Sequence, residues 1–246
     1  MKKIILAIAA FALCATAFAQ DREIDLEDWD NFNKIELSRG RSHVETNLTF
    51  AFPMHFGWTT LTNINYKGDW ATGDFSNFLN FNTGKNFMYG LQLVGMDLRY
   101  GAVGLNLGLR WTFMDFTFRD NKTSIKPSGN TFVPYYIDLV DATYNYRKSK
   151  IHASYFGIPA RLSLNFGKAS IYAGGSFEFL VNGFAKYRAP KSKTQMKNLF
   201  HQFRATVEGG FSYGNLGVFV QYGLTPLFPA DLSDAKTLTF GLLLGL

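Results

Sequence analysis

Five charged residues are the best placed for chemistry. They lie in segments where apolar and small polar residues alternate, and they occupy the polar positions: Arg110, Arg161, Glu178, Arg204 and Glu208. If these positions face an interior, the five residues form either an ion path or a network of ion pairs that braces the fold. Buried charges must be paired and hydrogen-bonded to be tolerated. We therefore predict stacked Arg–Glu clusters, and we favour the bracing network over the ion path.

A second candidate site is a run of bases with no acid among them: Lys186, Arg188, Lys191, Lys193 and Lys197. The segment expected beside it is also basic and contains Lys122, Lys126, Arg147, Lys148 and Lys150. Clustered bases attract phosphates and other polyanions. The pattern predicts a basic patch on one surface of the molecule. The patch is either a specific binding site for a polyanion or partner, or ordinary counter-charge to lipid headgroups, which is the interpretation we favour.

A third candidate is His152-Ala153-Ser154, in which a histidine and a serine share one face of a strand. Serine nucleophiles need a histidine base and an acid that orients it. The pair is similar to the His-x-Ser pair of lipid A deacylases, but no carboxylate of matching phase lies nearby in the sequence. We therefore predict no catalytic residue.

Metal and cofactor sites are also not expected. The other histidines, His43, His55 and His201, lie on different segments, and Cys14 lies within a predicted signal.

That signal covers residues 1–19. Lys2 and Lys3 precede an apolar core, and Ala17-Phe18-Ala19 forms a small-x-small motif, which predicts cleavage after Ala19. Residues 20–42 are acidic and lack strong periodicity, so we predict a periplasmic N-terminal segment. Within it, Ile35 and Leu37 are spaced for pairing as an edge strand.

The remaining chain, residues 43–246, alternates between apolar and small polar residues, a pattern typical of β-strands. Eight such segments cover about 43–58, 86–98, 102–113, the two arms of 151–188, 199–213, 215–225 and 237–246. In the second segment the apolar residues fall at odd positions up to Leu93 and at even positions from Val94 onwards. This change predicts a β-bulge.

The links between these segments alternate strictly between tight turns and long loops. Short links lie around Gly101, Gly167 and Gly214, and long ones cover roughly 59–85, 120–149, 189–198 and 226–235. All short turns then lie at one end, as in outer-membrane barrels. We predict an all-β, eight-stranded antiparallel up-and-down transmembrane β-barrel with short periplasmic turns and long extracellular loops.

A soluble barrel or sandwich would show the same alternation with its apolar face inwards. Lysine distinguishes the two, because a water-facing sheet surface carries many lysines and the centres of these segments carry none. The polar face holds glycine, small polar residues and isolated Arg and Glu, which suits a narrow interior.

Residues 154–167, SYFGIPARLSLNFG, resemble the Tyr-x-x-Ile-Pro-(apolar/polar)-x-Phe-Gly strand of PorT-like outer-membrane β-barrel proteins of Bacteroidota, small barrels of the OmpA/OmpX type. The Gly-rich strand at 171–175 and the closing strand at 237–242 are also similar to theirs. The resemblance implies insertion by the outer-membrane assembly machinery and no defined activity.

The function predicted from these patterns is that of a non-catalytic outer-membrane barrel with a plugged lumen, acting in structure, surface interaction or contact with lipopolysaccharide. The expected partners are outer-membrane lipid and lipopolysaccharide, without nucleic acid, and the expected state is a monomer. The alternatives are a narrow pore for small solutes and an enzyme that modifies lipid A.

Overall fold

The computed structural model describes residues 34–38, 44–49, 53–71, 78–129, 131–136, 148–188 and 192–245, the first two ranges by their backbone alone. The predicted signal at 1–19, most of the acidic segment 20–42, and Lys191 lie outside the described residues.

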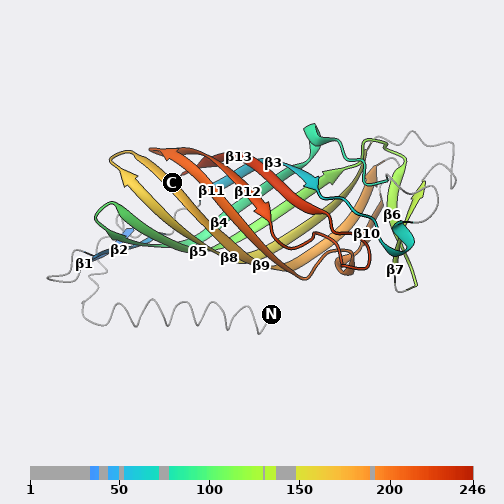
Figure 1. Ribbon diagram of the computed structural model, residues 1–246, viewed down its shortest axis with the longest axis horizontal. Coiled ribbons are helices and arrows are strands. Elements are labelled where there is room, and N and C mark those ends of the chain that lie inside the picture. Colours follow the sequence, from blue (N-terminus) through green and yellow to red (C-terminus); the bar gives the residue numbers. More distant parts are fainter. Residues whose placement is uncertain are drawn as a thin grey trace.

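Antiparallel strands close into a barrel (Figure 1). Its wall consists of β3 (Met54–Thr62), β4 (Phe87–Tyr100), β5 (Val103–Thr117), β8 (Lys148–Phe166), β9 (Ala169–Arg188), β11 (Phe203–Tyr213), β12 (Leu216–Gly223) and β13 (Lys236–Leu244). Each strand pairs with its neighbours in the chain, and β13 returns to pair with β3. The predicted eight-stranded, up-and-down, all-β barrel is confirmed.

The alternation in the sequence sorts side chains between the two faces of this wall. On β9, the exposed fractions of Phe177 and Phe179 are 56% and 48%, whereas those of Ser176 and Glu178 are 7% and 0%. Apolar side chains therefore point outwards over the barrel, and small polar and charged ones point inwards. This is the reverse of a soluble β-barrel.

The outward apolar side chains form a belt of nearly constant height. The belt runs over ten residue steps on four strands, from 103 to 113, 156 to 166, 171 to 181 and 203 to 213. At about 3.4 Å per residue and a tilt of roughly 40°, ten steps span about 25 Å, the height of the apolar band of outer-membrane barrels.

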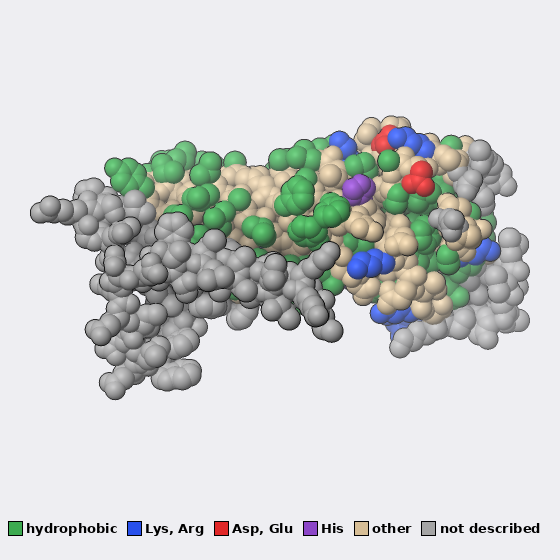
Figure 2. All heavy atoms as spheres, turned by 90° about the horizontal axis from the view of Figure 1, so that it is seen from below, with side chains coloured by type: hydrophobic (Ala, Val, Ile, Leu, Met, Phe, Trp, Pro, Cys, Tyr) green, Lys and Arg blue, Asp and Glu red, His purple; other side chains and the backbone are tan. Residues whose placement is uncertain are grey.

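Aromatic residues mark both edges of the belt, the positions at which membrane proteins place them. Tyr100, Phe166 and Tyr213 are exposed beside the tight turns, and Trp58 and Trp111 lie towards the long loops. Figure 2 shows apolar side chains spread along the visible barrel wall, whereas charged side chains gather at one end.

The tight turns at Gly101, Gly167 and Gly214 each place a glycine at positive φ (58°, 65° and 57°). The long loops lie at the opposite end of the barrel and contain more structure than the alternation indicates. They carry β6 (Thr123–Ser128), β7 (Thr131–Tyr136), β10 (Ser192–Gln195), and the 3-10 turns η2 (Gly68–Trp70), η4 (Thr83–Lys85) and η6 (Lys197–Leu199). Within the described residues, no helix is long and apolar enough to cross a membrane.

The first predicted strand, 43–58, is wrong as a single strand. It is divided into β2 (Val44–Thr49) and β3, and Pro53, which lacks an N–H group, lies just before β3. Both pieces pair with β4, and β2 also pairs with β1 (Lys34–Ser38). The edge strand expected around Ile35 and Leu37 is thus confirmed.

The sixth predicted strand, 199–213, begins too early. β11 starts at Phe203, and the preceding residues belong to η6 and a bend. Leu199 belongs to the apolar positions of that predicted strand, but it is 0% exposed because it packs into the apolar core of the long loops.

Two bulges adjust the barrel wall. The predicted bulge in β4 is confirmed, since the register with β5 shifts between Gln92 and Val94. A second shift, between β8 and β9, leaves Val181 unpaired and was not predicted.

Candidate functional site

All five predicted lumen charges meet at the centre of the barrel. They form a chain of alternating sign, Arg204–Glu178–Arg110–Glu208–Arg161. Arg204 Nη1 lies 2.7 Å from Glu178 Oε2, and Arg110 bridges the two glutamates at 3.2 Å (Glu178 Oε1) and 2.8 Å (Glu208 Oε2). Arg161 Nε donates to Glu208 Oε1. The five side chains are 1–6% exposed.

Polar side chains around this chain of charges take up the remaining hydrogen bonds. Ser176 and Thr112 donate to Glu178, Gln221 donates to Glu208, and Arg204 donates to Thr237 Oγ1 at 3.0 Å. Arg161 also contacts His55 of β3 and Gln92 of β4, so every strand of the barrel wall contributes at least one side chain. We name these charged and polar side chains the lumen charge network. Its members therefore tie the wall together from the inside.

His55 is a member of the lumen charge network that the sequence did not identify. Its Nε2 lies 2.6 Å from Arg161 Nη2. A guanidinium has only donors, so His55 Nε2 is the acceptor and the ring proton is on Nδ1. The alternation in the sequence places His55 on the inward face of its strand. Its contact with Arg161 on β8 could not be predicted, because it forms only when the barrel closes.

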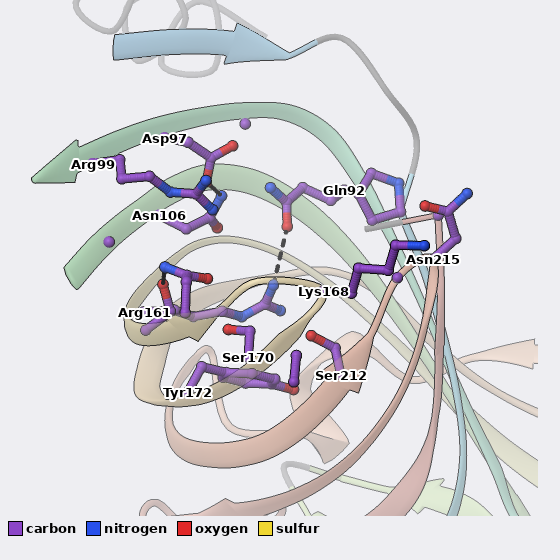
Figure 3. Close-up of a pocket in the computed structure, with 18 of the residues that line it drawn as sticks. Gln92, Asp97, Arg99, Asn106, Arg161, Lys168, Ser170, Tyr172, Ser212 and Asn215 are labelled. Carbon is purple, nitrogen blue, oxygen red and sulfur yellow. Dashed lines mark hydrogen bonds between the residues drawn. The ribbon is translucent and has the colours of Figure 1, made fainter. Parts of the chain in front are cut away.

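A cavity of about 640 Å³ lies between the lumen charge network and the tight turns (Figure 3). Arg99, Arg161 and Lys168 line it together with Asp97, which accepts a hydrogen bond from Asn106 Nδ2 at 2.6 Å. Tyr172 also lines the cavity, and its buried hydroxyl has no hydrogen-bond partner among the described residues. Polar walls of this kind suit water or a small polar solute.

An apolar core fills the barrel end on the other side of the lumen charge network. Met114 and Ile151 from the wall are 0% exposed, and aromatic loop residues pack above them. The centroid of the Trp70 ring lies 4.8 Å from that of Phe78 and 5.2 Å from that of Phe228. Trp70 Nε1 donates a hydrogen bond to the backbone carbonyl of Phe132 in β7.

Tyr66 packs beside this core, outside the belt. Burial raises the pKa of its hydroxyl, which accepts a hydrogen bond from the Leu79 amide at 3.3 Å. The long loops are therefore folded onto the barrel by packing as well as by their own strands.

The predicted basic patch is partly assembled. Lys186 and Arg188 lie at the end of β9, and Lys193 lies opposite Lys186 on β10. Lys197 is exposed on η6, and Lys191 falls outside the described residues. Lys148 and Lys150, expected on the neighbouring segment, pair directly with Arg188 and Lys186.

His152 has an acidic partner, so the prediction that no carboxylate lies near it is wrong. Asp115 Oδ1, from β5, lies 2.7 Å from His152 Nδ1. Its other oxygen lies 2.5 Å from Lys150 Nζ, and the His152 ring stacks on Phe184 with centroids 4.5 Å apart. Ser154 is 3% exposed, and no hydrogen bond between the described residues joins it to His152. An acid–histidine pair is present, but its serine is covered.

In the described part of the chain, no three His, Cys, Asp or Glu side chains lie close enough together to hold a metal ion.

Comparison with known proteins adds little. No protein-family model and no curated protein matches the chain. Among solved structures, it is similar to the crystal structure of Neisserial surface protein A (NspA), with 11% sequence identity and a TM-score of 0.32. The match covers 85% of this chain and 100% of that chain. A similarity at this level assigns neither a family nor a function.

Proposed function

We propose that the chain is a non-catalytic outer-membrane β-barrel whose tight turns face the periplasm and whose long loops face outwards. The observation that carries the proposal is the apolar belt, about 25 Å high, on the outside of a closed barrel. The predicted signal, with cleavage after Ala19, fits this location. The PorT-like resemblance, insertion by the assembly machinery and a monomeric state belong to the same proposal.

Cell fractionation and gel mobility test the membrane location. We expect the protein in the outer-membrane fraction, with a faster-migrating form in unheated samples that disappears on boiling. Recovery from the soluble periplasm with mobility that heating leaves unchanged would contradict the proposal.

We further propose that the lumen is closed and that the barrel serves as a membrane-anchored surface. Two features in series support closure: the lumen charge network and the apolar core above it. The side chains of both features are almost fully buried, which supports a lumen without a continuous file of water.

Planar-bilayer recording separates this proposal from a narrow pore. We expect no stable conductance steps from the folded protein. Reproducible steps from folded protein, absent from a boiled sample of the same preparation, would establish the pore instead.

A second candidate function, hydrolysis of a lipid acyl ester, has one observation in its favour, the Asp115–His152 pair. Against it, Ser154 is covered, and Asp115 is shared with Lys150. We therefore expect the mass of lipid A from producing cells to be unchanged. A mass change with the wild type that is lost with Ser154→Ala would establish the enzyme.

A further inference from the structure

Five basic residues form a ladder on three neighbouring strands near the long-loop end of the barrel. In the strand register, Lys148 pairs with Arg188, Lys150 pairs with Lys186, and Lys186 pairs with Lys193. Directly opposed residues of antiparallel strands point to the same face. We name these five residues the basic ladder.

The basic ladder lies on the outer face of the wall. The residues that alternate with it, Ser149, Ile151 and Ala185, are 0%, 0% and 4% exposed and point inwards. Its side chains therefore continue the outward parity that carries the lipid-facing apolar residues lower on β8 and β9. A ligand that reaches the ladder approaches along the outer wall and does not pass through the lumen.

The ladder lies just above the apolar belt. Ser154 pairs with Phe113, at the upper end of the belt on β5, and Lys150 lies four residues further along β8. Four residue steps at a tilt of roughly 40° amount to about 10 Å along the barrel axis. Headgroups begin at the edge of the hydrocarbon, and lysine side chains reach several ångströms towards them.

Like charges placed directly opposite each other destabilise a sheet. Asp115 is the one carboxylate of the described residues that forms an ion pair with the ladder, and of the five ladder residues it contacts only Lys150. Lys193 also lies 4.2 Å above the Phe184 ring. Lys148, Lys186 and Arg188 thus hold their charges close together without a carboxylate partner among the described residues, an arrangement that an anion would stabilise.

We propose that the basic ladder binds the phosphate groups of an anionic glycolipid headgroup in the outer leaflet. This inference rests on the proposed membrane location and specifies the lipid class and the residues involved. Ammonium and guanidinium groups make charge-assisted hydrogen bonds to phosphate oxygens. The Phe184 and His152 rings below them provide an apolar surface for the part of the lipid nearer the hydrocarbon.

The test compares two matched variants in neutral detergent micelles. Lys186→Gln/Lys193→Gln removes two charges from the ladder, whereas Lys67→Gln/Lys236→Gln removes two at the same end but on the β3–β13 side. The probes are bisphosphorylated lipid A, the same lipid with its phosphates removed, and inorganic pyrophosphate. The readout is the unfolding midpoint, followed by heat-modifiable mobility.

We expect lipid A to raise the midpoint of the wild type and of the control variant, and the ladder variant to bind it roughly thirty-fold more weakly. Without lipid, the ladder variant is expected to unfold at a higher temperature than the wild type, because repulsion is relieved. Dephosphorylated lipid and pyrophosphate are expected to have little effect.

Equal stabilisation of the ladder variant and the wild type by lipid A would overturn the site. An equal effect of dephosphorylated lipid would overturn phosphate recognition, and an equal effect of pyrophosphate would identify a free anion as the ligand. Failure of the proposed membrane location is distinguishable, because the wild type would then lack heat-modifiable mobility.

Discussion

At the scale of single residues, the lumen charge network is short of acids. Two glutamates serve three arginines, and Glu178 accepts from both Arg110 and Arg204. Removing one glutamate therefore leaves two guanidiniums without a full complement of acceptors. The sequence predicted these five members because charge at inward parity is rare, but it did not indicate which pairs would form.

Glu178→Gln is expected to destabilise the barrel by about 3–5 kcal/mol, the cost of breaking a buried ion pair by removing one partner. Unfolding by urea in detergent, followed by gel mobility, measures the change. Adding Arg204→Gln to this variant should recover part of the loss, since one unpaired charge is removed with it. A double variant less stable than Glu178→Gln alone would contradict the network as described.

Two buried tyrosines form a matched pair for measuring how much one hydrogen bond contributes to the free energy of unfolding. The Tyr155 hydroxyl donates to the His201 carbonyl at 3.2 Å, whereas the Tyr172 hydroxyl has no hydrogen-bond partner among the described residues. Tyr155→Phe is expected to cost about 1 kcal/mol, and Tyr172→Phe is expected to be neutral or slightly stabilising. The same unfolding assay checks both, and an equal cost would show that the Tyr172 hydroxyl is bonded in solution.

At the scale of elements, the β8–β9 hairpin shows what the sequence could and could not predict. Its parity placed Arg161 and Glu178 inside and Leu162 and Phe177 outside, all as observed. The bulge at Val181 left no such signal, because the residues around it fit either face. The contact of Asp115 with His152 was missed because it depends on the register between β5 and β8, which a long loop separates.

The hairpin also allows a test of membrane depth. Leu162 lies near the middle of the ten-step belt on β8, and Phe166 lies at its edge beside the tight turns, with exposed fractions of 61% and 60%. Leu162→Arg is expected to cost about 2–4 kcal/mol in lipid vesicles, and Phe166→Arg about 0–1 kcal/mol, because the cost of a charge falls towards the interface. Reversible folding into vesicles measures both, and equal costs would place the belt outside the bilayer.

At the scale of the whole molecule, three zones follow each other along the barrel axis: a polar cavity, the lumen charge network and an apolar core. The lumen charge network and most of the cavity lining come from the strands, and their residue types are visible in the alternation. The third was not predicted, because loop residues such as Trp70 and Leu199 pack by shape and show no periodicity. The fold class was thus predictable from the strands, and the apolar core at the long-loop end was not.

Barrel closure also sets an order on folding. The last ladder of hydrogen bonds joins β13 to β3, and the side-chain bond from Thr59 to the Leu238 carbonyl spans 179 positions of the chain. Contacts this distant carry a high loop-closure cost and form late. Until they form, β3 and β13 each present one unpaired edge, and such edges are prone to aggregation. Because β13 must be synthesised before it can meet β3, closure is necessarily post-translational, and the two open edges need protection until it happens.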